Sequence, residues 1–241
     1  MASLPQNIEN QDFNLNFKMK KNTLLFVLVT FFLFSCNQNS KSIPEKNVQI
    51  EKTNDKNVYT KYKYTNSDSG SIIVENSLPK GGMKYTDVKG EIYNYVVFWT
   101  RIINETDKTL ELNINFPLNS YEVPSLPGKY YEILIPPDTM TIEKSPLYLY
   151  GLTNFKTFLN NNIHKESNLK RTINSKESTG FYVVMLCLSE GAHGTMRTEL
   201  NLKEGNLFYR VKVDGSNTNN KSSDKQIRCG NVNMKNLIIQ K

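Results

Sequence analysis

The feature that most constrains the fold is the strict alternation of apolar and polar side chains in Leu110-Glu-Leu-Asn-Ile-Asn-Phe116. Side chains that alternate in this way point to opposite faces of an extended chain, so the pattern predicts an antiparallel strand with one buried face. The same alternation recurs over 196–202 and 207–213. Phe181–Leu188 is apolar at both parities, which predicts a central strand covered on both faces.

Further strands are predicted by short apolar runs that glycine, proline and asparagine clusters separate. These runs are Ile72–Val74, Ile92–Ile103, Tyr130–Ile135 and Gln226–Ile239. The turn signals between the strands include Lys80-Gly81-Gly82, Asn104–Asp107, Pro127-Gly128, Gly191 and Gly205-Asn206. Many short strands at this spacing favour a sandwich or barrel. We expect a mainly β fold, an antiparallel β-sandwich of immunoglobulin-like type, although the cysteine pair around a tryptophan that is usual there has no match.

One segment has helical rather than extended periodicity. Leu152, Phe155, Phe158 and Leu159 are spaced to share one helical face, so we predict a short helix over Thr153–Asn160 in a connection between strands. The polar residues of Asn161–Ser178 are expected to form a loop.

The chain begins with the pattern of an export signal. Met19-Lys20-Lys21 is positively charged, and Leu24–Phe34 is an apolar run of 11 residues. A run of this length is too short to cross a bilayer core of about 30 Å as a helix, and it fits the apolar region of a signal peptide. The polar residues 1–18 are unusual for such a segment and favour Met19 as the true start.

The apolar run ends in Leu33-Phe34-Ser35-Cys36. This motif resembles the lipobox of bacterial lipoproteins: an aliphatic residue, a variable one, a small one and then cysteine. The resemblance implies cleavage before Cys36, a diacylglyceryl group on its sulfur and acylation of its new amino terminus, which together anchor a protein stably to a membrane. In enteric bacteria, an aspartate directly after the lipidated cysteine resembles an inner-membrane retention signal. Asn37 occupies that position here, and the absence of the aspartate favours the outer membrane.

We therefore divide the chain into a signal peptide over 1–35, a lipidated cysteine with a flexible tether over 36–57, and a single β-sandwich domain over 58–241.

The net charge of +7 is dispersed over many lysines. A dispersed basic surface on an exported chain argues against nucleic acid as a partner. The part of the chain after Cys36 is rich in Asn and Lys. In this composition and in its lipobox, the chain resembles the many uncharacterised envelope lipoproteins of Bacteroidota.

Two cysteines remain beside Cys36. In an oxidising compartment Cys187 and Cys229 either form a disulfide that ties the last strand to the central one, or stay as separate thiols.

The two histidines, His164 and His193, fall in polar, turn-like contexts outside any zinc-binding motif. We therefore expect no metal, no cofactor and no catalytic residue.

The remaining candidates for function are aromatic. Tyr148 and Tyr150 alternate beside a predicted loop and are candidate ligand contacts, with core packing as the alternative. Trp99 and the aromatic residues of the same predicted strand are more simply interpreted as core packing than as ligand contacts. We expect a membrane-anchored, non-enzymatic binding or assembly module with an envelope protein or glycan as partner. The alternative is a hydrolase of envelope polymer or glycan, which predicts a cleft where Asp, Glu or His converge.

Overall fold

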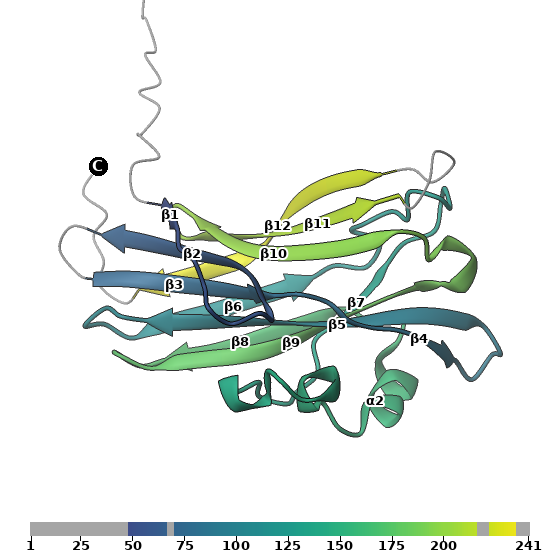
Figure 1. Cartoon of the computed structure of the whole chain (residues 1–241), viewed down its shortest axis with the longest axis horizontal. Helices are drawn as coiled ribbons and strands as arrows, with labels where there is room; N and C mark the ends of the chain where they lie inside the picture. Colours follow the sequence, from purple (N-terminus) through teal and green to yellow (C-terminus); the bar gives the residue numbers. More distant parts are fainter. Residues whose placement is uncertain (1–47, 67–69, 216–221, 235–241) are drawn as a thin grey trace, which may run out of the picture. The chain divides into compact units, whose positions relative to one another are not determined.

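The computed structural model of the chain describes residues 48–66, 70–215 and 222–234, which form two antiparallel sheets and one α-helix (Figure 1). The strands are β1 (Val48–Ile50), β2 (Val58–Asn66), β3 (Gly70–Ser77), β4 (Lys80–Thr86), β5 (Ile92–Asn104), β6 (Leu110–Phe116), β7 (Glu132–Leu134), β8 (Ser167–Ile173), β9 (Ser178–Leu188), β10 (Thr195–Lys203), β11 (Asn206–Asp214) and β12 (Ser223–Met234). The helix is α2 (Phe155–Asn162), and the 3₁₀ turns are η1 (Ile142–Lys144), η2 (Tyr148–Gly151) and η3 (Ser189–Gly191).

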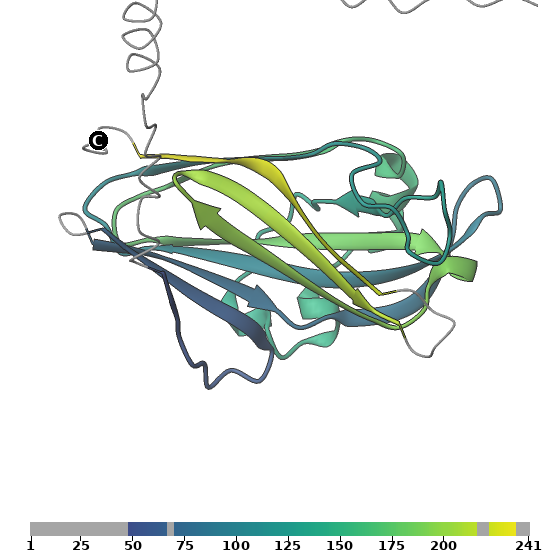
Figure 2. The ribbon, with the colours of Figure 1, turned by 90° about the horizontal axis from the view of Figure 1, so that it is seen from above.

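The first sheet has the strand order β1-β2-β3-β5-β9-β7, with β4 also paired to β5. The second sheet has the order β10-β11-β12-β6-β8. Figure 2, which looks down on the molecule, shows β10, β11 and β12 lying over strands of the first sheet. The predicted antiparallel β-sandwich is therefore confirmed, while its immunoglobulin-like type stays a prediction.

The main core lies between the two sheets and follows from the alternation in the sequence. In β6, Leu110, Leu112, Ile114 and Phe116 are all buried, while every intervening residue is at least partly accessible. They pack with apolar residues of β3, β5 and β9 from the first sheet and of β10, β11 and β12 from the second. The alternation thus fixes which face of each strand turns inward.

A second core covers the outer face of the first sheet. Trp99 and Tyr182, from β5 and β9, point into it and pack with Tyr150 and Leu159. Figure 1 shows α2 and the neighbouring 3₁₀ turns on this outer side. The central strand predicted at Phe181–Leu188 is therefore confirmed as covered on both faces, because its two sets of side chains enter different cores.

The predicted helix exists but is shifted along the chain, and α2 covers Phe155–Asn162. Leu159 is its one fully buried side chain, while Phe155 and Phe158 pack on the second core from the side. The preceding residue, Asn154, has a left-handed conformation (φ 53°), which delays the start of the helix.

Two segments differ from the prediction. The stretch expected to be loop contains β8, which pairs with β6 along its whole length. The expected turn at Lys80-Gly81-Gly82 is instead the start of β4, where Lys80 and Gly81 pair with β5 and a bulge between Gly81 and Met83 leaves Gly82 outside the register. A side chain on Gly81 would meet the carbonyl oxygen of Tyr95 at 2.7 Å, so glycine is needed there for close approach, not for a turn.

The folded part also begins earlier than the predicted tether boundary. Residues 48–50 form β1, which pairs with Tyr62–Tyr64 of β2. Glu51 continues this contact, because its amide bonds the carbonyl of Lys61 at 2.9 Å and its carboxylate pairs with the Lys61 ammonium at 3.0 Å. Cys36 and the signal segment lie outside the described residues.

Candidate functional site

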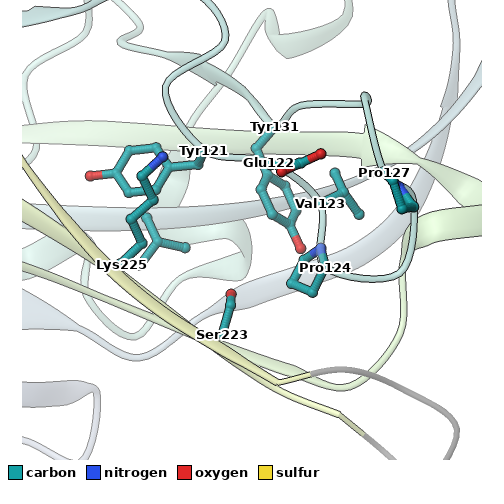
Figure 3. A pocket seen from close by; sticks show the side chains of 9 residues that line it. Tyr121, Glu122, Val123, Pro124, Pro127, Tyr131, Ser223 and Lys225 are labelled. Atoms are coloured by element: carbon teal, nitrogen blue, oxygen red, sulfur yellow. The ribbon is translucent and has the colours of Figure 1, made fainter. Parts of the chain in front are cut away.

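One cavity lies between the connection at 121–131 and strands β11 and β12 (Figure 3). Its volume is about 320 Å³, close to the lower end of the range for small-molecule pockets. The lining residues are Tyr121, Glu122, Val123, Pro124, Pro127, Tyr131, Val211, Ser223 and Lys225.

The connection is held in place by its own hydrogen bonds. The Tyr131 amide bonds the Tyr121 carbonyl, and the Val123 amide bonds the Lys129 carbonyl, both at 2.8 Å. The carboxylate of Glu122 accepts a hydrogen bond from the amide of Gly128 at 2.7 Å, across the turn that Pro127-Gly128 predicts. One wall of the cavity is therefore formed before any ligand arrives.

The two tyrosines of this wall are fixed in position. Tyr121 is 2% exposed, and its hydroxyl donates to the backbone carbonyl of Tyr209 in β11. Burial raises the pKa of Tyr121 and of Tyr131, so both remain neutral phenols. The Lys225 ammonium lies 5.9 Å from the centroid of the Tyr121 ring, and Figure 3 shows the two side chains together. The cavity thus combines a flat apolar wall with a cation at its edge.

A second cavity of about 280 Å³ also uses Tyr131. It is lined in addition by Met185 and Cys187 of β9 and by the turn around His193. Burial raises the pKa of the Cys187 thiol to about 11, so this cysteine is a protonated thiol at neutral pH. Cys187 and His193 line the same cavity, and burial disfavours the thiolate form through which a nucleophilic cysteine acts.

The structure places the predicted tyrosines in opposite environments. Tyr148 is 73% exposed and stays a candidate ligand contact. Tyr150 is fully buried, because left-handed conformations at Leu149 and Tyr150 turn its ring inward against Trp99 at 6.2 Å. Its expected role as a ligand contact is therefore replaced by the alternative, core packing. The face around Trp99 is core as well, with Trp99 itself 0% exposed.

Cys187 and Cys229 are both buried and free, which corrects the disulfide alternative. Cys229 contacts the carbonyl of Leu207, at the start of β11, whereas Cys187 shares a pocket with Val213, near the end of the same strand. Six residues of extended chain span about 20 Å, and a disulfide requires Cα atoms within about 7 Å of each other. The two thiols therefore lie toward opposite ends of the sandwich core.

Sequence reasoning missed a polar cluster around His164. The described residues include one group whose ligand atoms could hold a metal ion, Asp87, Glu91 and His164, with all three atoms within 4.8 Å of one another. Glu132 is bonded to the same histidine. The four residues come from three separate segments of the chain, so no spacing motif connects them.

No family model matches the chain, and no curated protein matches it either. Within the described part of the chain, no helix has the length and apolar character needed to cross a bilayer.

Proposed function

We propose that this chain is a lipoprotein of the bacterial cell envelope whose β-sandwich is a non-enzymatic binding module. The lipobox-like Leu33–Cys36, placed directly after an 11-residue apolar run, supports the anchor. Two or three acyl chains at Cys36 would hold the domain stably at a membrane. Asn37 supports the outer membrane as the site of anchoring.

The single observation that supports a binding role is the cavity between Tyr121, Tyr131 and Lys225. The edges of two rigid tyrosine rings and two prolines line this cavity, so its wall loses little entropy on contact with a ligand, and a few polar groups then fix the ligand's orientation. Pro124 and Pro127 extend the apolar wall, while Ser223 and Lys225 supply hydrogen-bond donors. This combination suits one ring of an envelope glycan, with its apolar face toward the tyrosines and its hydroxyl or acidic groups toward Lys225.

The anchor is tested by metabolic labelling with palmitate. The full chain should incorporate the label, and Cys36→Ser should lose it, because serine has no sulfur to accept the diacylglyceryl group. Cys229→Ser is the matched control and should label like the parent. Equal labelling of the parent and Cys36→Ser would overturn the anchor.

The binding role is tested by calorimetric titration of the full chain with soluble cell-wall glycan oligosaccharides. Lys225→Met keeps most of the side-chain length but removes the charge, and it should weaken binding about tenfold or more. Lys203→Met, at an exposed position at the end of β10, should bind like the parent. Binding that is unchanged in Lys225→Met, or no binding by the parent, would exclude this pocket as a glycan site and leave a protein partner as the remaining proposal.

A hydrolase of envelope glycan is the second candidate, and the convergence of Asp87, Glu91 and Glu132 on His164 favours it. Several carboxylates beside a histidine are a set that general acid–base chemistry uses. Release of reducing ends from cell-wall glycan, and its loss in Glu91→Gln, would establish this activity in place of simple binding.

A further inference from the structure

The cluster around His164 is assembled by the fold at one end of the first sheet. Asp87 and Glu91 flank the turn between β4 and β5, Glu132 begins β7, and His164 follows α2. Strand β9 lies between the other two strands, since it pairs with both β5 and β7. The cluster therefore joins the sheet to the helical layer that covers its outer face.

His164 is held in one orientation by Glu132. Its ring Nδ1 lies 2.8 Å from Glu132 Oε1, and its backbone amide donates to Glu132 Oε2 at 3.2 Å. An ionised carboxylate can only accept, so Nδ1 carries a proton, and Nε2 is the ring nitrogen that is placed to bind a metal. Histidines that bind metals are oriented in this way, with the distal nitrogen bonded to a carboxylate.

The Nε2 atom of His164 faces a buried carboxylate. Asp87 Oδ2 lies 4.0 Å from it, and the Asp87 side chain is only 2% exposed. Asp87 Oδ1 accepts hydrogen bonds from the amides of Lys89 and Glu91, both at 2.8 Å, whereas Oδ2 accepts none from any described residue. Asp87 Oδ2 therefore keeps its lone pairs for a cation or a water molecule.

Glu91 completes the group. Tyr93 donates its phenolic hydrogen to Glu91 Oε2 at 2.8 Å, which orients the carboxylate and leaves its other oxygen available. Asp87, Glu91 and Glu132 thus bring three carboxylates to the same histidine. Among the described residues, no lysine or arginine forms an ion pair with any of these three carboxylates.

We propose that Asp87, Glu91 and His164 bind a divalent transition-metal ion of the zinc class, with Glu132 as the residue that positions His164. In a tetrahedral site with bonds of about 2.0–2.2 Å, two ligand atoms on one zinc ion lie roughly 3.3–3.6 Å apart. The 4.0 Å between Asp87 Oδ2 and His164 Nε2 is too long for a hydrogen bond, and a closure of about half an ångström would let both atoms reach one ion. Ca²⁺ and Mg²⁺ prefer all-oxygen sites, so the imidazole nitrogen favours zinc.

The test is calorimetric titration of ZnCl₂ into the tag-free full chain after its metal has been removed with EDTA, with zinc content measured by mass spectrometry. We expect one Zn²⁺ per chain, and weaker binding of Ca²⁺ and Mg²⁺. Asp87→Asn keeps the Oδ1 acceptor for the turn, and His164→Asn keeps a residue that tolerates the left-handed backbone (φ 65°), so both should fold. Each should bind Zn²⁺ at least tenfold more weakly. His193→Asn, the only other histidine position, is the matched control and should bind like the parent.

Glu132→Gln separates positioning from folding. It should lower zinc affinity about 10- to 100-fold, as loss of a carboxylate behind a metal-bound histidine does. It should also change the visible absorption of Co²⁺ bound in place of zinc, a signal that a purely structural role would not alter. Absence of zinc binding to the parent, or equal affinities in the parent and His164→Asn, would overturn the proposal.

Discussion

Asn76 exchanges two hydrogen bonds with the backbone of Leu200, although the two residues belong to different sheets. Its Oδ1 accepts from the Leu200 amide at 2.8 Å, and its Nδ2 donates to the Leu200 carbonyl at 3.1 Å. The remaining capacity of the side chain is used by Thr60 and Thr100. Leu200 lies in β10, an edge strand of the second sheet, so this one amide side chain takes the place of a neighbouring strand.

Replacement of Asn76 should therefore destabilise the sandwich strongly. Asn76→Ala leaves the amide and the carbonyl of Leu200 buried without partners, which should cost about 2–4 kcal/mol in the free energy of unfolding. Urea denaturation followed by circular dichroism measures this loss. Asn113→Ala, at an exposed position of β6, should change stability by less than about 0.5 kcal/mol. Similar losses in both variants would contradict the role given to Asn76.

The second core should contribute to global stability through α2. Leu159→Ala removes its fully buried side chain and should cost about 2–5 kcal/mol, whereas Lys156→Ala on the exposed side should cost little. Trp99 is the only tryptophan and lies in this core, so its fluorescence reports on the layer directly. We expect the fluorescence and circular dichroism transitions to coincide; a separate, earlier fluorescence transition in the parent would mean that the helical layer unfolds alone.

Cys187 and Cys229 should be unreactive in the folded protein. Burial raises their pKa values to about 11 and about 12, so little thiolate exists at pH 8 and neither sulfur is accessible. A thiol reagent should modify both only after unfolding, without prior reduction, and a reductant should leave the urea midpoint unchanged. A midpoint lowered by the reductant would indicate a disulfide.

Stability should fall in alkaline solution. Burial raises the pKa of Cys187 to about 11 and those of Tyr64, Tyr150 and Tyr182 to about 12, above unfolded values of about 8.5 for cysteine and 10 for tyrosine. The folded state then holds more protons than the unfolded state, so this stability is fully present below about pH 8 and is lost as pH rises toward 12. Urea midpoints measured from pH 6 to 11 should show a plateau and then a decline. Cys187→Ala should reduce the decline that begins near pH 9, and a flat profile would contradict these shifts.

The extent to which the sequence predicts the fold depends on how completely each strand alternates. β6 was predicted with its observed bounds because every inward residue is a large apolar one. β8 was missed because Ser167 and Arg171 alternate with Leu169 and Ile173 at the inward-parity positions. Ser167 is nevertheless buried, and its hydroxyl accepts a hydrogen bond from the amide of Ile135 at 3.1 Å. A polar residue with a specific partner looks the same in a sequence as a solvated one.

The candidate sites were less predictable than the fold for a related reason. The cluster of Asp87, Glu132 and His164 depends on the order of strands β5, β9 and β7, which local periodicity does not encode. His164 alone resembles a loop residue, and only its contact with Glu132 gives it a chemical role. Tyr148 and Tyr150 were indistinguishable by composition, and two left-handed residues decide which of them is buried.

The position of β1 has a mechanical consequence if Cys36 is anchored as proposed. Among the described residues, a pull from the membrane would first reach Val48, in a three-residue strand at the sheet edge with Ile50 76% exposed. Such a strand would peel away from β2 before the cores are disturbed. Releasing residues 48–57 would add about 35 Å of extended chain. Detachment of this edge strand would then lengthen the reach of the domain under load, while the two sheets of the sandwich stay packed.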